Sequence, residues 1–331
     1  MFLVHYSRYF VFLFISISSN AQVKWINVDS AFQPLPKDFH VYRTTSMLEG
    51  KPFIAYYAEA RLKDKQLDFT TDTTYKRRLT PKQFYEKNEQ PLLVVNTTFF
   101  SFATHQNLNA VIKNGKVVSY NVHSIAGKGK DTLTYRHPFG SAIGIDKNRK
   151  ADIAWLYMDS SRSYSYAAQG SIEVIKDSLD HTITKDILGK KYQVMNAHRG
   201  ARMVSFNKWK METAVGGGPV LLQNGLIQIS NNNELKFAGK AIDDLHPRTS
   251  MGYTNDGRLI IMVIEGRRPG IAEGASLTQE ARLLKDLGCA EALNLDGGGS
   301  SCMLINGKET IAPSDKGVQR PVPAVFIIRK K

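Results

Sequence analysis

The chain has little cysteine, no long hydrophobic run and a shortage of acidic residues. Its 331 residues include only two cysteines, Cys289 and Cys302. Two cysteines cannot supply a disulfide framework, and the sequence leaves open whether they pair with each other. The apolar run at residues 9–17 is shorter than the roughly 20 residues that a membrane-spanning helix needs. We therefore expect no membrane span and a core that folds without disulfide support.

Several catalytic signatures are also missing. The eight histidines show no HExxH or similar metal-ligand spacing, and there is no GxSxG elbow or Walker-type lysine loop. The sequence therefore predicts no metal site and does not indicate a cofactor. Lys and Arg number 44 against 30 Asp and Glu, which gives a formal charge of +14 and favours anionic partners. The basic residues are scattered and form no nucleic-acid-binding motif, so nucleic acid is not an expected partner.

The first 21 residues have the layout of a secretory signal peptide. A weakly basic start precedes the apolar run, and small residues end at Ala21 before a cleavage point. We expect cleavage near Ala21 and a secreted or periplasmic protein. Residues 22–37 are predicted to form an N-terminal extension and residues 38–330 one compact domain, since no linker or low-complexity tract divides them. The oligomeric state is not indicated.

The predicted fold class is α+β, a mixed, hairpin-rich sheet system with a few packed helices. Asn-Gly or Asp-Gly pairs separate β-rich runs at residues 114–115, 224–225, 256–257 and 306–307. Such pairs tolerate the positive φ of tight turns, so four hairpins are expected. Further strands are expected at residues 53–60, 92–96, 142–145, 153–157, 194–196 and 324–328. Helices are expected at residues 80–87 and 277–287.

The stretch from Ser276 to Ser301 is the most informative. Ser276 and Gln279 form a capping-box pattern before an amphipathic run, and a short strand then leads into Asp296 and three glycines. Backbone N–H groups in such a loop are open to a ligand, and Gly298 offers close approach. Asp296 is a candidate acid, base, nucleophile or metal ligand, and it could also cap the turn.

Serines and an asparagine flank this carboxylate. Ser300 and Ser301 place two hydroxyls at the end of the loop. Asn294 lies two residues before Asp296, so on a strand the two side chains would share a face. We therefore take Asn294, Ser300 and Ser301 as candidate substrate-binding residues.

Charged groups also appear at the ends of a second predicted hairpin. Arg248 and Thr249 open its first strand, and arginine binds phosphate oxygens well. The second strand is apolar until Glu265, which Arg267 follows closely. Glu265 is the second candidate catalytic carboxylate, because glycoside cleavage ordinarily uses a pair of acids. The separation of the two carboxylates, and hence retention or inversion, cannot be derived from the sequence.

Two further segments could reach the same place. Gly217 and Gly218 belong to a glycine cluster that leads through a proline into a strand, where they allow close backbone packing or ligand approach. Asn96 ends a buried strand and could present its amide to a sugar hydroxyl or satisfy a turn. These residues complete the candidate binding set.

Read in order, VVNTTFF, GGGPVLLQNG, HPRTSMGYTNDGRL, EGRR and GASLTQEARLLKDLGCAEALNLDGGGSS resemble the phosphodiester glycosidase family. The resemblance implies that these blocks meet in one pocket that binds a sugar-1-phosphodiester. It implies roles for ten residues: Asn96, Gly217, Gly218, Arg248, Thr249, Glu265, Arg267, Asn294, Asp296 and Ser300. The chain departs from the family pattern at Thr97 and Thr98, where small residues are usual, and at Glu265, where Asp is common.

The leading hypothesis is an exported hydrolase that cleaves the glycosidic bond of a sugar-1-phosphodiester or a related cell-surface glycan. A non-catalytic binder of anionic glycans and a glycosyl transferase acting on exopolysaccharide are the alternatives. The expected partner in each case is a carbohydrate or a sugar phosphodiester. The sugar and its anomer are not indicated by the sequence.

Overall fold

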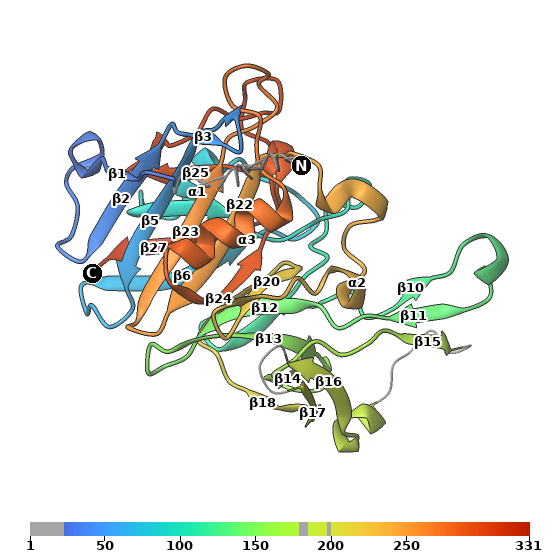
Figure 1. The fold of residues 1–331 in the computed structure, drawn as a ribbon. Helices are drawn as coiled ribbons and strands as arrows, with labels where there is room; N and C mark the ends of the chain where they lie inside the picture. Colours follow the sequence, from blue (N-terminus) through green and yellow to red (C-terminus); the bar gives the residue numbers. More distant parts are fainter. Residues whose placement is uncertain (1–22, 179–184, 197–199) are drawn as a thin grey trace, which may run out of the picture.

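The protein folds mainly into antiparallel β-structure. A computed structural model describes residues 23–178, 185–196 and 200–331 (Figure 1); the predicted signal peptide lies outside these ranges. The described residues contain 27 strands and three α-helices, and every pairing between these strands is antiparallel. The predicted α+β class with a mixed sheet is therefore wrong. Hairpins, rather than helical crossovers, join many neighbouring strands, and hairpins produce antiparallel sheets.

The largest sheet has eight strands and carries most of the segments of interest. In spatial order they are β1 (Ile26–Asn27), β2 (Phe39–Thr44), β5 (Ala55–Arg61), β23 (Arg258–Ile264), β22 (Arg248–Thr254), β24 (Cys289–Asn294), β20 (Val220–Gln223) and β21 (Leu226–Ile227).

Two other sheets pack with it. The five-stranded sheet consists of β26 (Lys308–Glu309), β25 (Met303–Ile305), β7 (Leu93–Asn96), β27 (Ala324–Lys330) and β6 (Leu67–Thr73). The seven-stranded sheet consists of β18 (Asn207–Trp209), β14 (Ser165–Ala168), β13 (Ala151–Tyr157), β12 (Ser141–Ile145), β19 (Thr213–Gly216), β8 (Val111–Lys113) and β9 (Lys116–Ser119).

Smaller elements complete the described structure. They are the sheet of β10 (Ile125–Ala126), β11 (Tyr135–His137) and β15 (Ile175–Ser178), and the pairs β16 (Tyr192–Asn196) with β17 (Gly200–Val204) and β3 (Met47–Leu48) with β4 (Lys51–Pro52). The helices are α1 (Pro81–Lys87), α2 (Asn231–Glu234) and α3 (Leu277–Asp286). None of the helices in the described ranges is long and apolar enough to cross a membrane.

The four predicted hairpins are confirmed. They are β8–β9, β20–β21, β22–β23 and β25–β26. The two predicted helices are confirmed as α1 and α3, and Ser276 and Gln279 form the expected capping box. Local signals were therefore sufficient for these elements.

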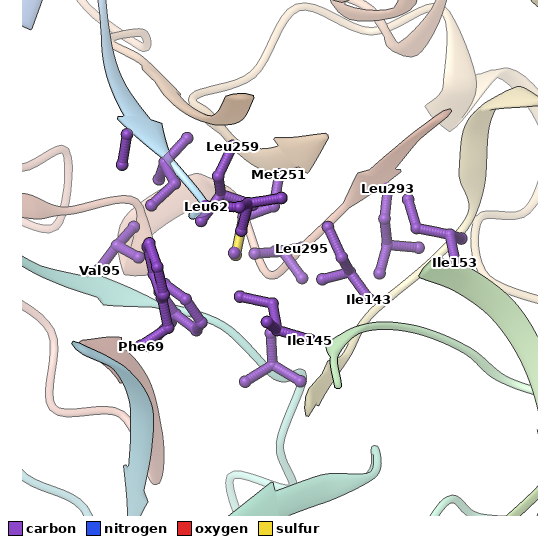
Figure 2. Packing of buried hydrophobic residues seen from close by; sticks show 14 of the residues in the cluster. Leu62, Phe69, Val95, Ile143, Ile145, Ile153, Met251, Leu259, Leu293 and Leu295 are labelled. Atoms are coloured by element: carbon purple, nitrogen blue, oxygen red, sulfur yellow. The ribbon is translucent and has the colours of Figure 1, made fainter. Parts of the chain in front are cut away.

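The central core lies between the three larger sheets. Figure 2 shows Met251 and Leu293 of the eight-stranded sheet in one cluster with Val95 of the five-stranded sheet and Ile143 of the seven-stranded sheet, and Leu293 lies next to Ile143. Burial of such side chains contributes about 1.5–3 kcal/mol each to folding. The core therefore fixes the three sheets, and the strand ends that leave them, relative to one another.

Helix α3 covers the opposite face of the eight-stranded sheet (Figure 1). Successive strand residues point to opposite faces, so Ile260, Met262 and Ile264 of β23 pack with Leu277 and Leu284 of the helix. The alternate residues of β23 enter the central core. Both faces of this strand are buried, which explains its unbroken apolar sequence.

Candidate active site

Four strand ends of the eight-stranded sheet lie at one edge. Arg248 begins β22 and pairs with Ile264, the last residue of β23. Asn294 ends β24, which pairs with β22 on its other side, and Val220 begins β20 opposite Leu293. Antiparallel neighbours run in opposite directions, so the start of one strand meets the end of the next. This arrangement brings together the segments that the sequence analysis singled out.

Asn96 connects this edge to the five-stranded sheet. Its Nδ2 donates to the backbone oxygen of Asp296 over 2.6 Å, and its Oδ1 accepts from the Thr249 hydroxyl and the Cys302 N–H, both over 3.0 Å. The Thr249 hydroxyl also lies 3.2 Å from the Ser301 hydroxyl. Asn96, Thr249 and Ser301 therefore use their polar groups to hold the loop of residues 296–301.

The glycine cluster packs directly against the end of β24. Asn294 Nδ2 donates to the Gly218 carbonyl over 2.8 Å, and the Gly218 N–H donates to the Asn294 carbonyl over 2.7 Å. A Cβ on Gly217 would clash with that same Asn294 carbonyl, so the close approach requires glycine. Asn294 Oδ1, which lies beside this turn, is buried and has no hydrogen-bond partner within the described ranges.

Two arginines lie over the loop of residues 296–301, which we call the glycine loop. A Cβ on Gly298 would lie 2.9 Å from Nη2 of Arg267, and one on Gly299 would clash with the guanidinium of Arg320. Arg267 has a φ of 61°, a left-handed conformation that is uncommon outside glycine. Arg320 donates from Nε to the Asp315 carboxylate over 2.8 Å. The loop therefore has two guanidinium groups on its surface.

Arg320 was missed by the sequence analysis. It lies in the loop before β27, and no recognisable motif surrounds it in QRPVPA. Its closeness to the glycine loop is purely spatial, and a single sequence carries no signal for such a contact.

The pKa of the Asp296 carboxyl lies close to neutral pH. Burial raises the pKa of this carboxyl from 3.8 to about 7, although the Ser300 hydroxyl and the positive charge of Arg320 act in the opposite direction. Loss of hydration disfavours the charged form of a carboxyl. Near neutral pH both forms of Asp296 are populated, so the group can either give or take a proton.

Arg248 is held by two backbone carbonyls, one on each side of β22 in sequence. Its Nε donates to the Ala275 carbonyl over 2.8 Å and its Nη2 to the Asp244 carbonyl over 3.0 Å. Its guanidinium carbon lies 5.8 Å from the centre of the Phe237 ring. Arg248 and the next residue, Thr249, point to opposite faces of the sheet. The guanidinium of Arg248 therefore packs on the α3 side of the sheet, whereas Thr249 joins the Asn96 network.

Glu265 is held by two residues outside the glycine loop. Its buried carboxylate accepts from Arg268 Nη1 over 2.5 Å and from the Ala312 N–H over 2.9 Å. Both oxygens are thus engaged by the protein. Arg267, two residues later in the same turn, lies against the glycine loop.

The two threonines that depart from the family pattern have different environments. The Thr98 hydroxyl donates to Asn107 Oδ1, whereas the Thr97 hydroxyl is buried without a partner in the described part of the chain. The Thr97 carbonyl accepts from the Asp296 N–H over 2.7 Å. Thr97 therefore supports the loop through its backbone, which any residue type could do.

Neither a metal site nor a disulfide is found where the chain is described. No cluster of three or more His, Cys, Asp and Glu side chains that could hold a metal ion occurs in these ranges. Cys289 and Cys302 are both buried and free, and burial raises the pKa of each thiol. Both cysteines serve as core residues.

Residues 177–329 match the model of the phosphodiester glycosidase family. The family resemblance is confirmed. The enzyme class expected from the sequence, a glycosidase, is that of the family. The matched range contains the edge with its glycine loop, both arginines and the glycine cluster, whereas Asn96 lies outside it.

Individual relatives support the same assignment. The chain is 31% identical to the mouse N-acetylglucosamine-1-phosphodiester alpha-N-acetylglucosaminidase and 30% identical to the human protein of that name, over 103 residues in each case. These alignments cover 29% of this chain and 20% of each relative. The chain thus matches only about a fifth of the length of these two proteins.

Solved structures show a similar fold over most of the chain. The catalytic domain of the zebrafish N-acetylglucosamine-1-phosphodiester alpha-N-acetylglucosaminidase superposes with a TM-score of 0.55 at 18% identity, covering 95% of this chain and 85% of that domain. A protein from Burkholderia pseudomallei superposes with a TM-score of 0.57 at 17% identity, covering 87% and 76% of the two chains. At these identities the likeness concerns the fold alone.

Proposed function

We propose that this protein hydrolyses the glycosidic bond of a sugar-1-phosphodiester. The observation that carries the proposal is the Asp296 carboxyl, whose pKa is raised to about 7 beside a loop that two arginines cover. A proton-transferring carboxyl next to guanidinium groups suits a reaction in which a phosphate leaves. The matched family and the names of the mouse and human relatives support the same substrate class.

In the proposed reaction the bond between the anomeric carbon and the bridging oxygen breaks, and that oxygen stays with the phosphate. A water molecule supplies the new hydroxyl of the sugar and releases one proton. Arg267 and Arg320 neutralise the departing phosphate, and open N–H groups of the glycine loop add donors. Asp296 either protonates the bridging oxygen or accepts the proton of the attacking water.

Glu265 is proposed to act with Asp296 as the second carboxylate. Its ion pair with Arg268 and its hydrogen bond from the Ala312 N–H hold the carboxylate in one orientation. Glu265→Gln tests the role: a catalytic carboxylate predicts a fall in kcat of at least about 100-fold. If kcat is retained while the melting temperature falls, Glu265 only supports the turn that carries Arg267.

We also propose that the protein acts outside the cytoplasm, on a soluble or cell-surface glycan phosphodiester. The signal-peptide pattern of residues 1–21 is the support for this part. N-terminal sequencing of protein recovered from the producing cells tests it, because export predicts a mature chain that begins close to Gln22.

A panel of α- and β-linked sugar-1-phosphodiesters tests the activity. Each compound is incubated with the parent protein and with Asp296→Asn, and released sugar and phosphate monoester are quantified. The proposal expects both products in equal amounts from at least one compound, and a loss of at least about 100-fold in the variant. A ligand that raises the melting temperature without any release would indicate a glycan-binding protein instead.

A further inference from the structure

A short segment after β21 forms a wall beside the glycine cluster. It comprises α2 and residues 235–237, and Asn231 closes it at both ends. Asn231 Oδ1 accepts from the Phe237 N–H over 2.9 Å, and its Nδ2 donates to the Phe237 carbonyl over 2.8 Å. Because one side chain binds both backbone groups of Phe237, the residues between them are held in a defined loop.

Glu234 fastens this segment to the sheet edge. Its buried carboxylate accepts from the Ser141 hydroxyl over 2.7 Å, the Trp155 indole N–H over 3.2 Å, the Ser230 hydroxyl over 2.5 Å and the Val220 N–H over 3.1 Å. The oxygens of Glu234 are therefore fully occupied by protein donors. They have little capacity left to bind a neighbouring cation.

The neighbouring cation is Lys236. Its ammonium lies 5.2 Å from the centre of the Phe99 ring, and within the described ranges it has no hydrogen bond or ion pair with an acidic group. Burial lowers the pKa of Lys236, which the charge of Glu234 only partly opposes. A partly buried ammonium with no hydrogen-bonded acidic partner costs free energy, and a bound anion would lower that cost.

A cavity of about 340 Å³ adjoins this ammonium. Its lining is largely apolar and comes from Phe99, Leu108, Val122, Ile125 and Pro138, together with Lys236, Glu234 and a few uncharged residues.

The two asparagines in that lining are already engaged. Asn109 accepts from the Phe99 N–H and donates to the Gly217 carbonyl, while Asn121 accepts from the Ala110 N–H and donates to the Gly140 carbonyl. The wall holds two ionic residues, Glu234 and Lys236. Protein donors occupy the Glu234 carboxylate, so Lys236 is the one that remains open to a ligand.

The cavity wall contacts the glycine cluster that packs against the end of β24. A Cβ on Gly218 would lie 2.6 Å from Cε of Lys236, and the carbonyl of Gly218 binds Asn294, two residues before Asp296. Phe99 follows Asn96 by three residues, and its ring lies 6.0 Å from that of Phe237. Gly218 therefore lies between Lys236 and Asn294, the last residue of β24 before the glycine loop.

We propose that Lys236 is an anion-binding residue of this site, which holds the phosphate of a phosphodiester whose apolar substituent occupies the 340 Å³ cavity. The identification of the anion as a substrate phosphate rests on the proposed function. The cavity chemistry by itself requires a phosphate-like anion that carries an apolar group. Phenyl phosphate should therefore bind more tightly than inorganic phosphate.

Differential lysine labelling tests the proposal on the unaltered protein. The full chain is acetylated with limiting acetic anhydride, with and without phenyl phosphate, and each lysine is quantified by peptide mass spectrometry. Labelling of Lys236 should fall at least fivefold in the presence of phenyl phosphate, while that of the exposed Lys240 should not change. Equal labelling of Lys236 with and without a saturating concentration of phenyl phosphate would overturn the proposal.

Three variants provide the second measurement, with phenyl phosphate and inorganic phosphate as titrants in calorimetry. Lys236→Met should weaken binding of both at least tenfold, Lys236→Arg should stay within about threefold of the parent, and the matched control Lys240→Met within twofold. Parent-like binding by Lys236→Met would refute the role of this ammonium.

The two proposals fail in different ways. If the parent cleaves a sugar-1-phosphodiester and Lys236→Met does so with the same KM, the inference about Lys236 is wrong and the proposed function stands. If phenyl phosphate protects Lys236 but no panel compound is cleaved, the anion site stands and the proposed function fails.

Discussion

Replacing Asp296 by asparagine removes the proton-transferring group and, at the same time, a carboxylate that the fold accommodates poorly. In the folded protein burial raises the pKa of this carboxyl from 3.8 to about 7. A shift of about three units corresponds to about 4 kcal/mol of differential stability. Because the folded pKa lies above the unfolded one, this contribution is fully present below pH 4 and is lost as the pH rises through 7.

Asparagine stays neutral at every pH, so the variant should not lose that contribution. We expect the free energy of unfolding of Asp296→Asn, relative to the parent, to increase by about 4 kcal/mol between pH 4 and pH 8. Urea unfolding at a series of pH values measures this difference, and titrations common to both proteins cancel. The gain in stability should accompany the loss of activity, as expected where a catalytic group is kept in an unfavourable environment.

Asp256 provides a control of opposite sign. The Thr254 hydroxyl and Arg258 lower the pKa of its carboxyl, so Asp256→Asn should be less stable than the parent above pH 4, and this deficit should shrink as the pH falls below 4. If the difference in free energy of unfolding between Asp296→Asn and the parent is instead constant from pH 4 to pH 8, the Asp296 carboxyl is an ordinary hydrated acid. Asp296 would then lack the raised pKa on which its role as a catalytic acid depends.

Further predictions concern the glycines, a second buried acid and the thiols. Gly217→Ala should destabilise the fold by about 1–3 kcal/mol, because its Cβ would meet backbone atoms. Gly299→Ala should keep the melting temperature of the parent, because its Cβ would displace only the Arg320 side chain. Its kcat/KM should nevertheless fall at least tenfold. Glu280→Gln should raise stability by about 3 kcal/mol at pH 8, since burial raises the pKa of this carboxyl from 4.5 to about 7; urea unfolding measures it, and an unchanged midpoint would contradict it. The two buried cysteines should react with iodoacetamide only in denaturant, and reductant should not alter the melting temperature.

Much of the local structure could be derived from the sequence because its signals are local. The Asn-Gly and Asp-Gly pairs located four hairpins, and the Ser276 capping box located α3. The fold class could not be derived in the same way. The direction in which distant strands pair depends on contacts far apart in sequence, and these produced antiparallel sheets packed mainly on each other.

The candidate site shows the same division. Asn96, Thr249 and Ser301 were selected by residue type and family pattern, and they form one network around the Asp296 loop. Arg248 was selected by the same reasoning, yet strand alternation turns it towards the α3 side. Arg320 carries no motif, because its closeness to Gly299 arises only when the loop before β27 packs on the glycine loop.

The central claim is that the bond to the anomeric carbon, not a bond to phosphorus, is cleaved at the Asp296 loop. Turnover of a sugar-1-phosphodiester in ¹⁸O-labelled water, followed by mass spectrometry of both products, tests it most directly. The account predicts one ¹⁸O atom in the released sugar and none in the phosphate monoester, with at least a 100-fold loss of labelled sugar in Asp296→Asn. Label in the phosphate monoester, or undiminished turnover in the variant, would contradict it.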